Sequence, residues 1–303
     1  MAHPPVNTSE GPSDKEPSHK APRPKGPLGI FAGQGPLPLT VARAARDEGR
    51  EVFIIALKGE TDPSVEEFPH RWVKWGELAK TLNFYKDNKV NDLVLIGPVA
   101  RPSLSDIRPD WMAIKFLPRL IKLLRQGDDG LLSGLVNYME NEHGLRIVPA
   151  EAVNTDLLAP AGLLTNRKLS EQDEADLTRA IEVVETMGRL DIGQGAVVCR
   201  GIAIALEASE GTDNMLLRVA TLDPALRGSS ADRAGLLLKL PKPEQDRRVD
   251  LPTIGATTIE NAAAAGLAGV VVQEGGALIV DLESTVHRAN KLGLFVLSLA
   301  KSE

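Results

Sequence analysis

The sequence predicts an α/β protein with two domains, the first of them built on a parallel sheet. In the first half of the chain, short apolar runs that end in glycine alternate with segments of helical spacing. This alternation is typical of a parallel sheet covered by helices on both faces. The second half has a different order of elements and begins with a long helix and a strand hairpin. A chain of 303 residues, 43% of them hydrophobic, can build two cores.

The first domain is expected to begin with three strands separated by two helices. The strands are the apolar runs LGIFAG, EVFIIALKG and DLVLIGPV, and the helices are LTVARAARDEGR and WGELAKTLNFYKDN. A helix-rich stretch broken at Pro118 and Gly127 follows, and RIVPA resembles a fourth strand. Loop signals between residues 151 and 170 mark a boundary. The domains are therefore expected at 28–155 and 165–303.

The second domain is expected to open with the helix SEQDEADLTRAIEVVETMGRL, which Ser170 caps and Gly188 stops. The next segment, GAVVCRGIAIALEASEG, is predicted to form a hairpin of two buried strands that turns at Arg200-Gly201. A short helix capped by Thr212 and the strand GLLLKL follow. The remaining elements are expected in the order helix, strand, strand, helix, strand.

The first 27 residues are predicted to be a disordered tail outside the fold. They hold seven prolines and almost no large apolar side chains, so they cannot bury enough surface to offset the entropy of ordering. The tail also lacks the apolar core of a secretory signal. No apolar run approaches the ~20 residues of a membrane helix. These features predict a cytoplasmic protein.

Composition and motifs argue against several function classes. The net charge of −6 and a pI near 5.5 argue against a general nucleic-acid binder. The single cysteine, Cys199, lies in an apolar run and is read as a buried strand residue. The histidines show no metal-binding spacing, and neither a Walker loop nor a nucleophile elbow is present.

Two glycine-containing loops follow strands of the first domain. In GQGPLP, Gly33 and Gly35 allow backbone N–H groups to approach an anion at a helix N-terminus, although a tight turn without a ligand is the alternative. The dinucleotide fingerprint is broken because Pro38 stands where its third glycine belongs. In GPVARP, Arg101 is expected to point into the same crevice, unless it is an ordinary surface arginine.

Two motifs bracket the predicted hairpin, so their ends are expected to lie close together. One is DIGQGAVV, which contains Gln194 and Gly195, and the other is EGTDNM. Thr212 is expected to cap a helix whose free N–H groups favour an anion. Glu210 and Asp213 carry oxygen ligands that suit a hard cation such as Mg²⁺. The alternative is a capping box without chemistry.

A stiff, charged loop, PKPEQDRRVDLPTIG, connects two predicted buried elements. Pro252 fixes its own φ and keeps Leu251 out of the helical region, so Asp250 is presented from an extended segment. The alternative is a solvated charged loop. Four cations in or beside the loop are placed to clamp phosphates: Lys239, Lys242, Arg247 and Arg248.

Taken together, these motifs resemble the LpxI family. The matching stretches are GIFAGQGPLP, GPVARP, GRLDIGQGAVV, EASEGTDNMLLRVA, KPEQDRRVDLPTIG, GLAGVVVQEGGALIV and GLFVLS. They run in order from about residue 28 to residue 298, and only the tail is outside the resemblance. The resemblance implies a UDP-2,3-diacylglucosamine pyrophosphatase of lipid A biosynthesis, with a Rossmann-like N-terminal domain and a distinct C-terminal domain.

The resemblance also implies a reaction and a set of site residues. Mg²⁺-dependent hydrolysis of the diphosphate would give UMP and 2,3-diacylglucosamine 1-phosphate (lipid X). The family's catalytically important aspartate lies in the DLPTIG motif and is Asp250 here, with Asp213 as the second candidate. The expected metal ligands are Glu210, Asp213 and Asp250. The expected substrate-binding residues are Gly33, Gly35, Arg101, Gln194, Gly195, Gly211, Thr212, Lys239, Lys242 and Thr253.

Other functions and partners stay open at this stage. A nucleotide or nucleotide-sugar binding protein could use the same crevice without turnover, whereas the broken fingerprint disfavours a dehydrogenase. The expected partner is a lipid-linked nucleotide sugar. A homodimer and a peripheral contact with the cytoplasmic face of the inner membrane are further hypotheses. The segment 108–124 is the candidate for membrane contact or for lining an acyl groove, and a helix packed on the sheet is the favoured alternative.

Overall fold

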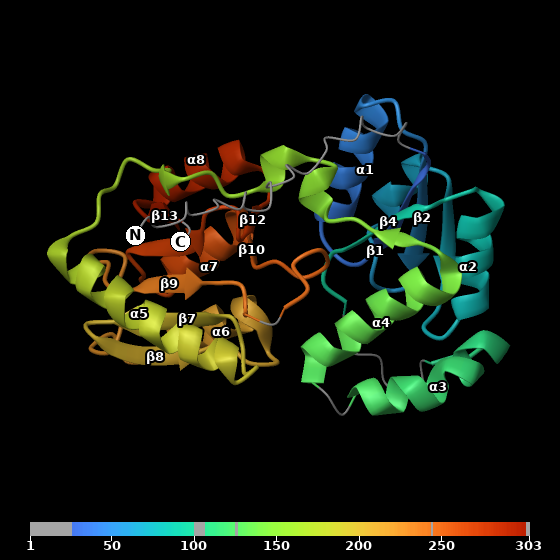
Figure 1. Ribbon diagram of the computed structural model, residues 1–303. Coiled ribbons are helices and arrows are strands. Elements are labelled where there is room, and N and C mark those ends of the chain that lie inside the picture. The colour runs from blue at the N-terminus through green and yellow to red at the C-terminus, as the bar shows by residue number, and fades with distance from the viewer. Residues whose placement is uncertain (1–25, 100–106, 125–126, 244, 301–303) are drawn as a thin grey trace, which may run out of the picture.

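The structure is a computed structural model that describes residues 26–99, 107–124, 127–243 and 245–300. Two sheets, each with its own helices, lie side by side (Figure 1). The α/β fold class and the parallel first sheet are confirmed. The disordered tail predicted for residues 1–27 falls outside the described residues except for its last two. Within the described chain, no helix is long and apolar enough to cross a membrane.

The first sheet is fully parallel, with strand order β3-β2-β1-β4-β5. Its strands are β1 (Leu28–Ala32), β2 (Val52–Leu57), β3 (His70–Val73), β4 (Asp92–Ile96) and β5 (Arg146–Ile147). The order reverses between β1 and β4, which is where open parallel sheets bind ligands. The sequence did not predict β3, because this edge strand buries only Val73 and therefore shows no apolar run.

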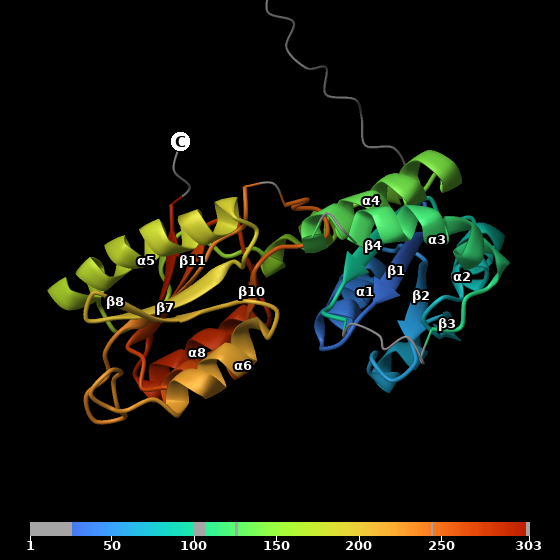
Figure 2. The same cartoon turned by 90° about the horizontal axis from the view of Figure 1, so that it is seen from below.

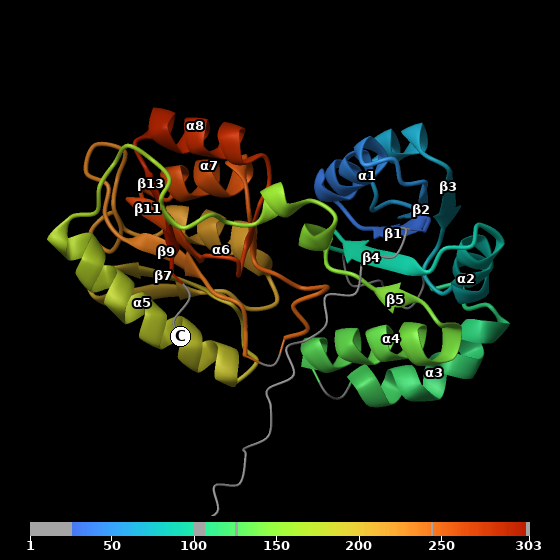
Figure 3. The same ribbon diagram turned by 45° about the horizontal axis from the view of Figure 1, so that its top comes forward.

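Helices cover both faces of this sheet. They are α1 (Leu37–Asp47), α2 (Leu78–Asp87), α3 (Trp111–Leu124) and α4 (Gly127–His143), with the 3₁₀ turns η1 (Pro63–Glu67), η2 (Ala150–Ala152) and η3 (Thr155–Leu157). One core cluster lies against α1, and another lies against α2 and α4 on the opposite face (Figure 3). In segment 108–124, α3 packs on α4 and α2, and its Met112 contacts the core cluster beneath α2 and α4.

The second sheet is mixed, with strand order β6-β13-β11-β9-β7-β8. Its strands are β6 (Gly162–Leu163), β7 (Gly195–Cys199), β8 (Ile202–Leu206), β9 (Leu236–Lys239), β11 (Gly269–Gln273) and β13 (Phe295–Leu299). Strands β9, β11 and β13 are parallel, whereas β7 runs antiparallel to both β8 and β9. A separate parallel pair joins β10 (Thr253–Ile254) to β12 (Leu278–Ile279).

One long helix covers one face of the second sheet and three shorter helices cover the other (Figure 2). The long helix is α5 (Glu171–Arg189), and the others are α6 (Gly211–Ala220), α7 (Ala256–Ala264) and α8 (Leu282–Leu292). Ser170 caps α5 in a capping box with Asp173, as predicted. The helix ends at Arg189, one residue after the predicted stop at Gly188, with Leu190 as its C-cap, and Asp191 follows with a left-handed φ of 52°.

The β7–β8 hairpin turns at Arg200-Gly201 as predicted, and both residues have positive φ, at 54° and 80°. The expectation of two buried strands is wrong for β8. This strand lies at the sheet edge, and the Ile202 side chain is 59% exposed. Apolar composition alone cannot separate an edge strand from a central one, because burial is set by the neighbouring strands.

The second half of the chain also contributes to the core of the first. Leu251 and Val280 pack against the cluster beneath α1, to which Leu278 belongs, and Val249 packs against the cluster beneath α2 and α4. The chain between β9 and β10 therefore lies between the two sheets (Figure 1). Segments of both halves of the chain are thereby brought together between the two sheets.

Candidate active site

A cavity of about 890 Å³ lies between the two sheets. Its N-terminal side is formed by the loops that follow β1 and β4, together with the start of α1 and η2. Its C-terminal side is formed by the ends of β9 and β10 and by the first residues of α6, α7 and α8. The carboxyl ends of parallel strands and the amino ends of helices thus meet in one place, an arrangement suited to an anionic ligand.

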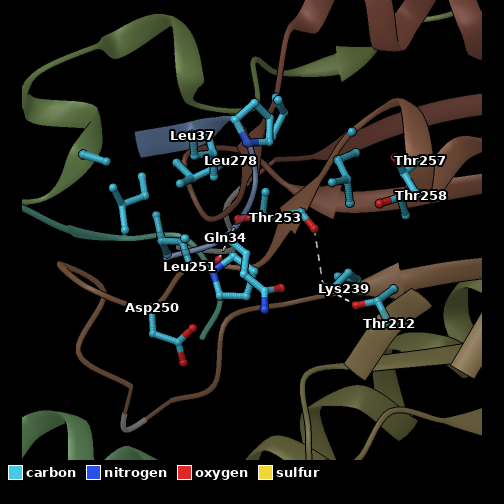
Figure 4. A pocket seen from close by; sticks show the side chains of 18 of the residues that line it. Gln34, Leu37, Thr212, Lys239, Asp250, Leu251, Thr253, Thr257, Thr258 and Leu278 are labelled. Carbon is cyan, nitrogen blue, oxygen red and sulfur yellow. Dashed lines mark hydrogen bonds between the residues drawn. The ribbon is translucent and has the colours of Figure 1, made fainter. Parts of the chain in front are cut away.

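A buried charged network forms part of the cavity wall. The Lys239 ammonium donates to Thr212 Oγ1 at 2.6 Å and lies 3.5 Å from the Thr253 carbonyl oxygen (Figure 4). Thr212 Oγ1 in turn donates to Glu207 Oε1 at 2.7 Å. The side chains of Lys239 and Glu207 are only 5% and 9% exposed. Thr212 is therefore not the helix cap that its position predicts; Glu210 occupies the N-cap of α6 without a side-chain cap bond.

The glycines of DIGQG make room for Glu207. A Cβ on Gly195 would lie 2.3 Å from Glu207 Oε2, and a Cβ on Gly193 would lie 1.9 Å from the Glu207 carbonyl oxygen. The Glu207 N–H also donates to the Gly195 carbonyl. Gly195, a predicted substrate-binding residue, is thus buried beneath the network, while Gln194 lines the cavity.

Three helix N-termini point their first residues at the cavity. The starts of α6 and α7 carry no side-chain cap bond, while Asp281 caps α8 through Ser284 N–H. Gly211 and Thr212 belong to the α6 start, and Thr253 leads into α7. Uncapped N-termini retain N–H groups that favour negative charge. Together with Lys239 between them, these N–H groups place donors for an anion on a wall that also carries the carboxylates Glu207, Glu210 and Asp213.

Asp250 lines the same cavity and is half-buried on the loop between β9 and β10. Its neighbours Val249 and Leu251 pack into the two core clusters of the first domain. Pro252 is buried. Asp250 and the Lys239–Thr212 pair occupy separate segments of the wall (Figure 4). Asp250 is thus held in place by the packing of the residue on each side of it, in addition to the restriction expected from Pro252.

Arg248 ties this loop to the first domain. Its guanidinium donates to Asp246 at 3.0 and 2.8 Å and to Glu140 of α4 at 2.8 Å. These hydrogen bonds raise the pKa of Arg248 and lower the pKa of Asp246. Arg248 therefore restrains the loop from a position two residues before Asp250, and both Arg247 and Arg248 line the cavity. Lys242 lies outside this lining and pairs with Asp191 at 2.6 Å.

The three predicted metal ligands all line the cavity but do not form a three-ligand group. Glu210 pairs with Arg218 at 3.1 Å, and its own backbone N–H and that arginine lower the pKa of Glu210. Asp213 Oδ1 accepts from Asn261 at 3.0 Å. Among the described residues, no three histidine, cysteine or carboxylate side chains are placed to hold a metal. The donors fit Mg²⁺ only in its common form, with one or two carboxylates and the phosphates of a substrate.

On the opposite side, the GQGPLP loop is fixed by packing. Gly33 N–H donates to the Ile96 carbonyl at 2.9 Å, and Gln34 N–H donates to the Pro98 carbonyl at 2.8 Å. These two N–H groups are already hydrogen-bonded within the protein, so they are not available for the predicted contact with an anion. Gly35 is exposed with a φ of 81°, and Gln34 lines the cavity. Arg101 lies outside the described residues.

Glu207 and Glu151 are among the cavity carboxylates that were not singled out from the sequence. Glu207 directly follows the apolar strand IAIAL, so an acid at a strand end was its only signal. Glu151 follows the buried Ala150, and burial raises the pKa of its carboxyl. Neither acid belongs to a sequence motif typical of catalytic or metal-binding sites. Each lies at the cavity only because folding brings separate segments of the chain together.

The comparisons with known proteins cover nearly the whole chain. Residues 27–157 match the family model described as LpxI N-terminal domain, and residues 160–297 match the LpxI C-terminal domain. A curated relative from Caulobacter vibrioides, named UDP-2,3-diacylglucosamine pyrophosphatase LpxI, is 43% identical over 276 residues. That match spans 91% of this chain and 98% of the relative.

Two solved structures have low similarity to this chain. CobK precorrin-6A reductase is 12% identical, with a TM-score of 0.33 over 92% of this chain and 89% of that one. An isoflavone reductase is 11% identical, with a TM-score of 0.24 over 92% and 80%. Neither score supports an argument about function.

Proposed function

This chain belongs to the LpxI family, and from that premise we propose that it hydrolyses the diphosphate of UDP-2,3-diacylglucosamine in lipid A biosynthesis. The products would be UMP and 2,3-diacylglucosamine 1-phosphate (lipid X). One observation carries the proposal: the buried Lys239, between two uncapped helix N-termini, shares a cavity with Asp250. A diphosphate needs such a wall because its negative oxygens repel a nucleophile.

The chain's own residues divide this chemistry between two sides of the cavity. Lys239 and the starts of α6 and α7 neutralise phosphate charge and orient the diphosphate. Asp250, held by the packing of Val249 and Leu251, positions the attacking water and accepts its proton, or binds the metal. Mg²⁺ would be held by Asp250 or Asp213 together with phosphate oxygens, and when bound it supplies charge neutralisation.

The direct test is incubation of the purified protein with UDP-2,3-diacylglucosamine and Mg²⁺, followed by analysis for UMP and lipid X. Appearance of both products supports the proposal. Binding of the substrate without release of UMP would favour a non-catalytic nucleotide-sugar binding protein that uses the same cavity. Fluorescence titration with NAD addresses the dehydrogenase alternative, for which we expect no binding because the fingerprint is broken at Pro38.

The metal requirement is a separate prediction. We expect EDTA to abolish UMP release and added Mg²⁺ to restore it, because the described residues supply few metal ligands and the substrate phosphates must complete the coordination. Rates measured across a Mg²⁺ titration check this result. Undiminished turnover in EDTA would show that Lys239 and the helix N-termini neutralise the diphosphate without a metal.

Glu140→Gln tests the restraint on the Asp250 loop. The change removes the ion pair between α4 and Arg248, so we expect kcat/KM to fall about tenfold because the position of Asp250 is less restricted. The pair is partly exposed, so the free energy of unfolding should change by only about 0.5 kcal/mol. Glu185→Gln, on the exposed side of α5, is the control. Equal kinetic constants for the two variants would show that the Arg248–Glu140 ion pair does not help to position Asp250.

A lipid substrate also requires a route from a membrane. In α3, the Trp111 and Ile114 side chains are 66% and 56% exposed, while Phe116 is buried against Tyr138. We infer that this exposed face makes the peripheral contact with the inner membrane. The cytoplasmic location and the homodimer stay predictions.

A further inference from the structure

We propose that Glu207 is a positioning residue of the reaction: its buried carboxylate holds the Thr212 hydroxyl so that the Lys239 ammonium is fixed toward a phosphate oxygen of the substrate. The inference rests on the proposed function, because it assigns Lys239 to the diphosphate. Glu207 would act through Thr212 and Lys239, without touching the reacting atoms itself.

The direction of each hydrogen bond follows from the donors present. A lysine ammonium can only donate, so the 2.6 Å contact makes Thr212 Oγ1 the acceptor from Lys239. The threonine hydroxyl has one proton, which it therefore donates to Glu207 Oε1 at 2.7 Å. Glu207 thus sets the orientation of the hydroxyl, and that hydroxyl sets the position of Lys239.

This network leaves Lys239 with a donor for the cavity. Two of its three N–H groups are directed at Thr212 Oγ1 and, at 3.5 Å, at the Thr253 carbonyl oxygen. Among the described residues, no acceptor is hydrogen-bonded to the third, and Lys239 lines the cavity. Charge-assisted hydrogen bonds to phosphate oxygens are among the strong ones in proteins. A lysine that is 95% buried and restrained in this way loses little side-chain entropy when it binds an anion.

The geometry is not that of an ion pair formed for stability alone. The closest approach of Lys239 Nζ to Glu207 Oε1 is 3.8 Å, and Thr212 stands between them. The second carboxylate oxygen, Glu207 Oε2, is buried and has no hydrogen-bond partner in the described structure. An unsatisfied buried acceptor costs stability, and a buried ion pair is weak evidence for stability.

The fold nevertheless accommodates this carboxylate in detail. Glycines occupy positions 193 and 195, where any side chain would collide with Glu207. The two ends of the β7–β8 hairpin meet at the Glu207 N–H and the Gly195 carbonyl. The DIGQG motif is thereby connected to the phosphate-facing wall, although Gly195 itself lines none of the cavity.

The test is a double-mutant cycle on kcat/KM for UMP release. Lys239→Met should lower kcat/KM about 100-fold, as expected for loss of one preorganised donor. Glu207→Gln keeps the shape and an acceptor for Thr212 but removes the charge, so we expect a loss of about tenfold, mainly in kcat. In the double variant the loss should stay at about 100-fold, because Glu207 acts only through Lys239.

Two further pairs of variants separate positioning from structure. Thr212→Ser retains the hydroxyl and should keep nearly full activity, whereas Thr212→Val interrupts the link and should behave like Glu207→Gln. Glu185→Gln, on the exposed side of α5, should change nothing. Circular dichroism and thermal unfolding identify folded variants, and the Thr212 pair decides the question if Glu207→Gln does not fold.

Each outcome has a defined meaning. Losses that multiply to about 1,000-fold in the double variant would overturn the inference, since Glu207 would then act independently, for example as a base. Full activity of Glu207→Gln would also overturn it. If the unmodified protein releases no UMP, the proposed function fails, and the same cycle is measured as Kd for inorganic pyrophosphate by calorimetry. Non-additive losses of affinity there support the inference, and additive or absent losses overturn it.

Discussion

Replacing Asp250 by asparagine is expected to lower kcat for UMP release by about 1,000-fold, with a much smaller change in KM. Asparagine retains the shape of the side chain but cannot accept a proton or supply a full negative charge to a metal. Val249 and Leu251 anchor the loop on both sides of this position, so the substitution should leave the fold intact. Initial rates of UMP release, measured alongside thermal unfolding, check both parts.

The control for this variant is Asp232→Asn, which removes an 87% exposed carboxylate from a distant loop and should leave kcat unchanged. Full activity of the Asp250 variant would move the catalytic carboxylate elsewhere. Asp213 would be the next candidate, because it lines the same cavity at the start of α6. A loss confined to KM would instead assign Asp250 to substrate binding.

Gly33→Ala is expected to reduce the free energy of unfolding by about 3 kcal/mol, at the upper end of the range for overpacking. A Cβ at Gly33 would lie 2.3 Å from the Gly97 carbonyl oxygen and 2.5 Å from that of Pro98. Both atoms are backbone, and Gln34 N–H already bonds the second of them, so relief requires breaking the contact between the two loops. Urea unfolding monitored by circular dichroism measures the difference.

Gly35→Ala is the matched control from the same motif. No atom lies within 4 Å of a Cβ at Gly35, and the substitution only forces alanine into a φ of 81°. That conformation costs about 1 kcal/mol. Equal destabilisation by the two substitutions would contradict the packing explanation of the GQGPLP motif. A larger effect at Gly33 would favour the tight-turn interpretation over a direct ligand contact.

The alternation of apolar runs and helical segments was sufficient to predict most of the fold. Strands β1, β2 and β4 are buried on both faces, so their sequences are almost continuously apolar and easily recognised. The edge strand β3 escaped recognition because one neighbour gives it too little burial to require an apolar run. The exposure of β8 was not predicted for the opposite reason, because this strand has an apolar sequence although it lies at the sheet edge.

The site was only partly predictable, because its residues come from both domains. Local rules identified the rigid presentation of Asp250, since Pro252 acts on its immediate neighbour. They assigned Thr212 to helix capping, whereas in the structure its hydroxyl joins Lys239 to Glu207. Lys242 was expected to bind phosphate, but it pairs with Asp191 outside the cavity lining. Long side chains can reach several partners, and only the packed structure selects among them.

By itself, the sequence determined most of the succession of elements, apart from short strands such as β3, together with the turn at Arg200-Gly201 and the restriction that Pro252 places on Leu251, because backbone sterics and local burial act over a few residues. The tertiary structure decided which residues meet: Glu207 against Gly195, Lys239 on Thr212, and Asp250 between two cores. Those contacts join residues that are distant in the chain, so they depend on how the two sheets are placed beside each other and on where each strand ends. No local pattern carries that information.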